Sequence, residues 1–104
     1  MLNELKGLEK ICAQYLNNIL KDCDQMTALL ESKESLNEEE EKAVRKFGHQ
    51  TYGSGSTYGF DFISDSGQNV TKAVHGKEGL DKIRAIIADL KVKIQQAKID
   101  NHFE

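Results

Sequence analysis

Residues 51–62 read TYGSGSTYGFDF, and no other stretch of the chain has a comparable composition. The triplet Thr51–Gly53 recurs as Thr57–Gly59 on the other side of a Ser-Gly-Ser spacer. From Tyr58 onward, aromatic residues occupy every second position, which is the period of a half-buried strand. The segment therefore predicts either a β-hairpin that turns at the spacer or a loop whose backbone and hydroxyls hold a ligand.

The sequence before this segment predicts one long helix over residues 2–32. Apolar residues recur there at intervals of three and four, the spacing of one helix face. They include Leu8, Cys12, Leu16, Ile19, Cys23, Met26 and Leu30.

A second, short helix is expected over residues 36–47. Ser35 stands three residues before Glu38, the spacing of a capping box, and Gly48 follows as a natural helix end. Acidic residues at the start of this segment and basic residues at its end complement the helix dipole, so the acidic run has a structural explanation.

The last third predicts a helix over residues 77–100 with a strict heptad seam. Its apolar positions step by three and four: Leu80, Ile83, Ile87, Leu90, Ile94 and Ala97. A second line on the opposite face, Ala85, Val92 and Ile99, recurs every seven residues. One seam explains antiparallel packing on the first helix, and the second line predicts contact with something else, either the short helix or another copy of the chain.

The expected fold is mainly α: an antiparallel bundle of two long helices and one short helix, with a small β-hairpin or Gly/Ser-rich loop over residues 48–76. The 104 residues, without proline, fit a single domain over 1–104.

Composition and charge narrow the function classes. With a net charge of −3, the chain lacks the positive charge that is typical of proteins that bind a nucleic-acid polymer. It also has no apolar run long enough to span a membrane. Leu2, Glu4 and Lys6 alternate where a signal peptide would be continuously apolar, so we expect a cytoplasmic protein. Cys12 and Cys23 lie too far apart along one helix to form a disulfide, and neither has metal-site spacing.

The chemistry-bearing residues cluster in and after the TYGSGSTYGFDF segment. Backbone N–H groups that glycine leaves accessible, together with hydroxyls, would bind an anion. Aromatic rings would stack on a base or sugar, and basic residues would neutralise the charge of the anion. The candidate ligand-binding residues are Tyr52, Ser54, Ser56, Thr57, Tyr58, Phe60, Lys77 and Arg84. No catalytic residue, metal ligand or cofactor is assigned.

The leading hypothesis is a non-enzymatic, oligomeric binding or regulatory protein that contacts a small anionic ligand, such as a nucleotide, through residues 51–62. It would associate with itself, as a homodimer or higher oligomer, through its C-terminal helix. One alternative is an inhibitor of a partner protein, of the antitoxin, immunity or anti-defence type, or a chaperone. A second alternative is a small hydrolase that uses His49, Ser54 and Asp61.

Overall fold

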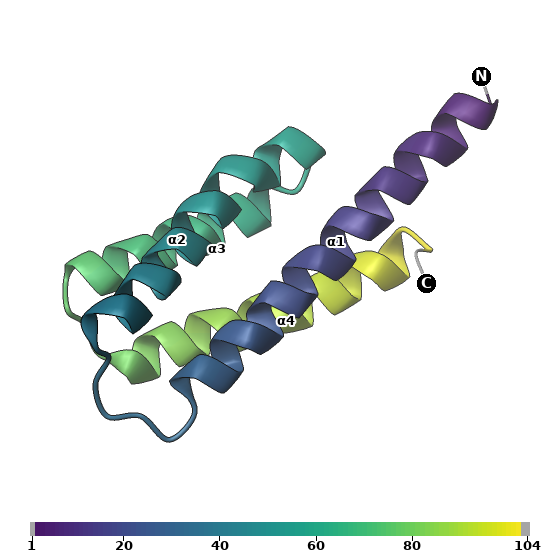
Figure 1. Ribbon diagram of the computed structural model, residues 1–104. Coiled ribbons are helices and arrows are strands. Elements are labelled where there is room, and N and C mark those ends of the chain that lie inside the picture. Colours follow the sequence, from purple (N-terminus) through teal and green to yellow (C-terminus); the bar gives the residue numbers. More distant parts are fainter. Residues whose placement is uncertain (1, 103–104) are drawn as a thin grey trace.

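The computed structural model describes the backbone of residues 2–102 and the side chains of residues 7–102, and within this range it holds four α-helices and no strand (Figure 1). The helices are α1 (Leu2–Leu30), α2 (Glu38–Gly55), α3 (Asp61–His75) and α4 (Leu80–Asp100), with a short 3-10 helix η1 (Ser56–Tyr58) after α2. The expectation of a mainly helical chain is confirmed.

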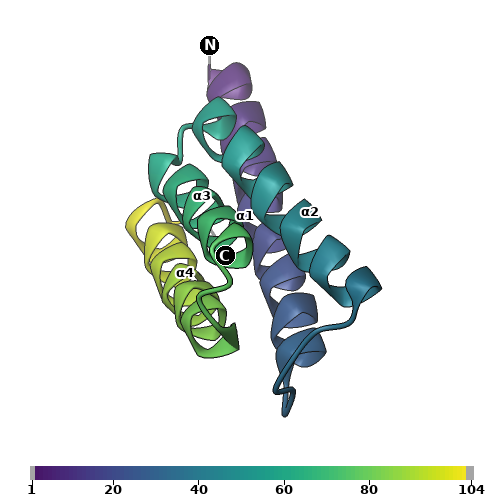
Figure 2. The ribbon, with the colours of Figure 1, turned by 90° about the vertical axis from the view of Figure 1, so that its left-hand side faces the viewer.

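The helices form two antiparallel pairs that lie against each other. One pair is α1 with α4, and the other is the hairpin of α2 and α3 (Figures 1 and 2). The molecule measures 50 × 22 × 18 Å, and it is elongated because α1 runs past the other helices at its N-terminal end. Between residues 2 and 102, none of the helices has both the length and the apolarity that crossing a bilayer requires.

The predicted pairing of the first and last helices is confirmed. Polar contacts run in antiparallel order along the pair: Lys98 Nζ donates to Asn17 Oδ1 at 2.7 Å, and Lys91 Nζ lies 2.6 Å from Asp24 Oδ1. The predicted heptad seam faces inward, and its four central residues are buried: Ile83, Ile87, Leu90 and Ile94. Together with buried residues of the other helices they form one core.

The predicted β-hairpin or Gly/Ser-rich loop over residues 48–76 is wrong, because most of these residues are helical. Helix α2 continues beyond the expected end at Phe47, through Gly55, and Gly48 is a buried helical residue instead of a helix end. The helix also begins later than expected, after the N-cap residue Asn37. The side chain of Asn37 accepts from the Glu40 N–H at 2.8 Å, while the Glu40 carboxylate accepts from the Asn37 N–H at 2.9 Å. This reciprocal pair is a capping box.

The small residues that resemble a loop form the contact between α2 and α3. A Cβ on Gly67 would lie closer than 3.0 Å to Tyr52 N, and one on Gly55 closer than 3.0 Å to Ser64 N. A Cβ on Gly48 would lie 2.7 Å from Thr71 Oγ1. These contacts step by one helical turn in opposite directions along the two helices, so the backbones touch along an antiparallel seam that only glycine permits.

The turn between α2 and α3 is set by hydrogen bonds that need glycine at residue 59. The N–H of Phe60 donates to Gly55 O at 2.8 Å, and the N–H of Gly59 donates to Ser56 O at 3.0 Å. This is the bonding pattern of a Schellman motif, which places a left-handed residue after the helix. Gly59 is that residue, with φ +86°. Gly59 therefore ends the helical segment that α2 and η1 form and allows the chain to turn into α3.

We predict opposite effects from two Gly→Ala substitutions in the same hairpin. Gly67→Ala drives a methyl group into the backbone of α2. This overpacking should lower the free energy of unfolding by about 2 kcal/mol. Gly53→Ala meets no atom within 4 Å. Because alanine favours the helix, this change should raise the free energy of unfolding by roughly 0.5 kcal/mol.

Urea unfolding followed by circular dichroism measures both variants against the wild-type protein. Equal effects of the two substitutions would refute the seam.

Candidate functional site

The hydroxyl groups expected to bind a ligand already have partners within the protein. Ser54 Oγ shares a 2.7 Å hydrogen bond with Tyr15 Oη, and Ser56 Oγ donates to Ser64 Oγ at 3.2 Å. Thr57 Oγ1 donates to Gly53 O at 3.4 Å. These side chains close the end of α2 and join it to α1 and α3, so their role in the structure is local.

The aromatic residues of the same segment pack against α1. The ring of Tyr58 stacks on Tyr15 with centroids 4.1 Å apart and an angle of 8° between the planes. The ring of Phe60 lies on the same residue, with centroids 6.2 Å apart. The Phe60 separation falls in the range of favourable aromatic pairs, and the Tyr58 ring lies slightly closer to Tyr15 than that range. Tyr15 is thus the centre of this cluster, and its place on the apolar face of α1 is the signal that could have indicated it.

The surroundings of Tyr15 also affect its ionisation. Burial is the main reason why the pKa of Tyr15 is raised, and its hydrogen bond to Ser54 partly opposes that rise. The phenol therefore stays protonated at neutral pH and can share its hydrogen bond with Ser54.

Two rings of the predicted set keep substantial exposure. Tyr52 is 49% exposed on α2 and Tyr58 is 39% exposed at the hairpin end. A flat surface for stacking therefore exists here, although the neighbouring hydroxyls point to internal partners.

The two basic residues of the predicted set lie at the other end of the bundle. Lys77 lines a pocket together with Glu41, near the start of α2, whereas Tyr58 follows the end of that helix. About 20 Å of helix separates Glu41 from Gly55, at ~1.5 Å per residue. Within one chain, the eight predicted residues therefore do not form one site.

Arg84 binds the C-terminal end of α1. Its Nη2 donates to Leu30 O at 2.6 Å and to Lys33 O at 2.5 Å, and its Nε donates to Leu30 O at 3.2 Å. Its Nη1 donates to Asp81 Oδ1 at 2.8 Å. A cation at this position satisfies carbonyls that the helix leaves free and complements the helix dipole. The guanidinium is committed to holding α1 against α4.

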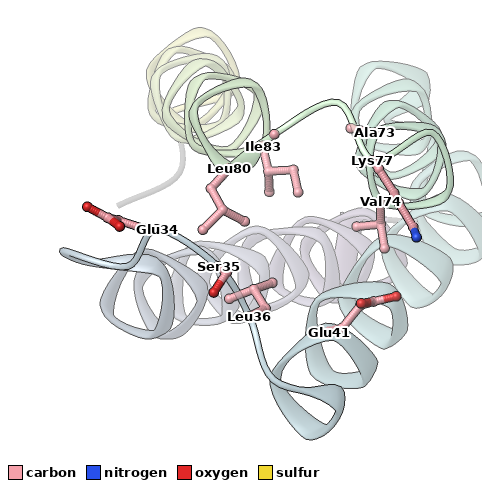
Figure 3. Close-up of a pocket in the computed structure, with 10 residues that line it drawn as sticks. Glu34, Ser35, Leu36, Glu41, Ala73, Val74, Lys77, Leu80 and Ile83 are labelled. Carbon is pink, nitrogen blue, oxygen red and sulfur yellow. The ribbon is translucent and has the colours of Figure 1, made fainter.

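The cavity that contains Lys77 lies where the α1–α2 and α3–α4 connections meet. It has a volume of about 300 Å³, and its apolar surface comes from Leu36, Ala73, Val74, Leu80 and Ile83. Charged groups stand around that surface, with Lys77 and Glu41 on the α2–α3 side and Glu34 opposite (Figure 3). With two carboxylates and one ammonium around it, this cavity does not favour an anion.

Lys77 adopts the left-handed conformation, with φ +50°, directly after α3. The N–H of Lys77 donates back to Val74 O at 3.2 Å, and the N–H of Glu78 donates to Ala73 O at 3.0 Å. These two bonds again follow the Schellman pattern. A lysine here costs more than a glycine, but the bonding pattern accounts for the conformation without a ligand.

The side chains of the hypothetical hydrolase are not brought together. His49 lines a groove between α2 and α3, Ser54 is bonded to Tyr15, and no hydrogen bond joins either of them to Asp61 among the described residues. Within residues 7–102, no three His, Cys, Asp or Glu side chains converge in an arrangement that could hold a metal ion.

The two cysteines differ in their surroundings. Cys23 is fully buried in the core, and burial raises the pKa of its thiol to about 12. Cys12 is half-buried near the hairpin end, where its Sγ lies 3.9 Å from Tyr58 O. Both are free thiols.

Comparison with protein-family models, with curated proteins and with solved structures gave no match to this chain. The candidate sites are therefore those that the residues and their geometry define.

We predict that Arg84 acts structurally. Arg84→Ala removes the bonds to Leu30 O and Lys33 O. Because three hydrogen bonds from a charged group to these two carbonyls are lost, the free energy of unfolding should fall by about 2 kcal/mol. Arg84→Lys should lower it less, because an ammonium keeps the charge but cannot reproduce the planar fork. Urea unfolding is the measurement, and an unchanged midpoint for Arg84→Ala would contradict the assigned role.

We predict that the two thiols react at very different rates. Only the thiolate is nucleophilic, and the raised pKa of Cys23 keeps it protonated at pH 8, so iodoacetamide should label Cys12 first. Intact-mass spectrometry of native protein should show one adduct early, and Cys12→Ser should remove that fast phase. In denaturant both thiols should react. Equally fast labelling of both in the native protein would show that Cys23 is not enclosed.

Proposed function

We propose that the protein is a non-enzymatic binding protein that acts through exposed helix faces, and that α4 pairs with α4 of a second copy. The observation that carries this proposal is the exposure of two large apolar side chains on α4: Val92 is 64% exposed and Ile99 is 67% exposed. Apolar residues aligned on a solvent-facing stripe are typical of helix-docking surfaces.

The stripe lies opposite the buried seam of α4. Ala85, Val92 and Ile99 recur every seven residues. Ala88 and Gln95 lie three residues after Ala85 and Val92, so all five residues share one face of the helix. No member of this set carries a charge, although 30% of the chain is charged. An uncharged heptad line fits a helix of the same kind, which makes a homodimer the simplest assembly.

The charges beside the stripe do not oppose such a pairing. Lys91 lies 2.6 Å from Asp24, and Lys93 lies 3.0 Å from Asp89, so the cations on either side of Val92 are neutralised within the chain. Like charges brought together across an interface would cost free energy. A second copy can approach Val92 without that cost.

Other exposed apolar residues support binding to a partner protein as well. Leu8 is 59% exposed and Ile11 is 50% exposed in the first half of α1. An inhibitor or chaperone that occupies a partner's surface would use such a face.

A small anionic ligand at residues 51–62 is a second candidate. The exposed rings of Tyr52 and Tyr58 favour it, because a base can stack on the Tyr52 ring or on the face of Tyr58 that does not stack on Tyr15. In this version the rings contribute more than the serine and threonine hydroxyls, whose hydrogen bonds are already used.

We predict that the wild-type protein has twice the 11.7 kDa chain mass in light scattering after size exclusion, and that Val92→Lys with Ile99→Lys makes it monomeric. Like charges placed directly on the stripe would repel across the dimer. The matched control, Gln68→Lys with Asn69→Lys, makes the same charge change at exposed positions of α3 and should remain dimeric. Wild-type protein that stays monomeric at every concentration would refute self-association.

A further inference from the structure

A row of basic side chains follows one face of α2. Lys42, Arg45, Lys46 and His49 stand at i, i+3, i+4 and i+7, which places them on the same side of the helix. The protein as a whole carries a net charge of −3. The row is therefore a basic patch on a protein whose net charge is negative.

Helix α3 completes this row into a groove of about 310 Å³. The groove is lined by Lys42, Arg45, Lys46, His49, Thr71 and His75, so all of its lining residues except Thr71 are basic and none is acidic. The close approach of the helices at Gly48 and Thr71 is what brings His75 beside the α2 row. The groove thus depends on the same glycine seam as the fold.

The charges in and around the groove are largely unneutralised. Glu41 pairs with Arg45 at 2.5 Å, but among the described residues no carboxylate lies within ion-pair distance of Lys42, Lys46 or the neighbouring Lys72. Other acidic residues nearby are Glu38, Glu39 and Glu40, which open α2 one turn before Lys42, and Asp22 of α1, which lines a neighbouring cavity together with Lys46. Of these, Glu40 pairs with Lys33.

We propose that this groove binds a ligand with two or three adjacent phosphates. Ammonium and guanidinium groups form strong, charge-assisted hydrogen bonds with phosphate oxygens, and imidazole nitrogens add further donors. Single carboxylates would use only part of the row, whereas linked phosphates match several cations spaced along about two helical turns. The groove's volume lies at the lower end of the range for small-molecule sites, which suits such a compact group.

Free nucleotides and phosphorylated lipid headgroups both carry this chemistry. Tyr52 follows His49 by one turn on the same helix. Its ring is 49% exposed, so a base attached to the phosphates would have a surface to stack on. This arrangement favours the nucleotide. The groove lies on α2 and α3, so the proposal is independent of self-association through α4.

The test is a titration of the full chain with tripolyphosphate, followed by amide chemical shifts in NMR at low ionic strength. We expect saturable binding, shift changes concentrated at residues 42–49 and 71–75, and weakening as salt is added. Lys42→Gln with Lys46→Gln should weaken binding roughly tenfold, since two exposed charge contacts are lost. Both side chains are exposed, so the fold should be retained, which circular dichroism checks.

The matched control is Lys10→Gln with Lys21→Gln, which removes the same charge from exposed positions of α1. It should change affinity by less than about twofold, because neither of these lysines lines the groove. Equal weakening by both double variants, shift changes centred on residues 51–62, or no saturable binding would overturn the proposal.

Two further arms identify the source of the phosphates. Adenosine triphosphate that binds at least as tightly as tripolyphosphate, with phosphatidylcholine vesicles containing phosphatidylinositol bisphosphate failing to retain the protein, supports a free nucleotide. Retention by those vesicles, but not by phosphatidylcholine alone, supports the lipid headgroup.

Discussion

The close contact of the α2 and α3 backbones is the constraint on which the rest of the structure depends. At Gly67 and Gly55 the helices are so near that a single methyl group would collide with the backbone of the facing helix. Helix interiors normally disfavour glycine by about 1 kcal/mol relative to alanine, so each one lowers intrinsic helix stability. Packing along the seam offsets that cost. It also fixes the register of the hairpin, since a shift by one residue would place side chains where only hydrogen atoms fit.

The second helix pair supplies a different kind of contact. Between α1 and α4 the apolar heptad seam is filled by long aliphatic side chains, and polar groups at the edges set its direction. Arg84 fixes one end of this pair by binding Leu30 O, at the end of α1, and Lys33 O, just beyond it. At the other end, the stack of Tyr58 on Tyr15 joins the hairpin to α1. The bundle is thereby held at both ends, and the outer face of α4 remains exposed.

The sequence predicts the long helices well and the middle of the chain poorly, for a physical reason. Amphipathic spacing depends on large apolar residues, which α1 and α4 have and the α2–α3 seam lacks. Along that seam the contacts come from small residues, which also favour turns. The frequency of glycine and serine therefore predicts a β-hairpin or a loop instead of two helices. The helical spacing was present nonetheless, because the small residues step by three and four: Gly48, Thr51 and Gly55, and then Ser64, Gly67 and Thr71.

The separation of the predicted ligand residues within one chain has the same cause as the absence of the hairpin. The predicted ligand residues do not converge, because residues 61–75 form helix α3, which runs back along α2 and carries Lys77 and Arg84 away from residues 51–62. The heptad period indicates the second apolar line on α4, but only the folded structure shows that Val92 and Ile99 are exposed.

The most direct test of the α2–α3 seam is a set of NMR measurements on residues 48–76 of the intact protein. Carbon chemical shifts should be helical through Gly55, and nuclear Overhauser effects should connect the Gly67 Hα protons with the amide of Tyr52, whose nitrogen faces the missing Cβ. Extended-type shifts across residues 51–62, with cross-strand effects between Tyr52 and Tyr58, would contradict the seam and restore the β-hairpin.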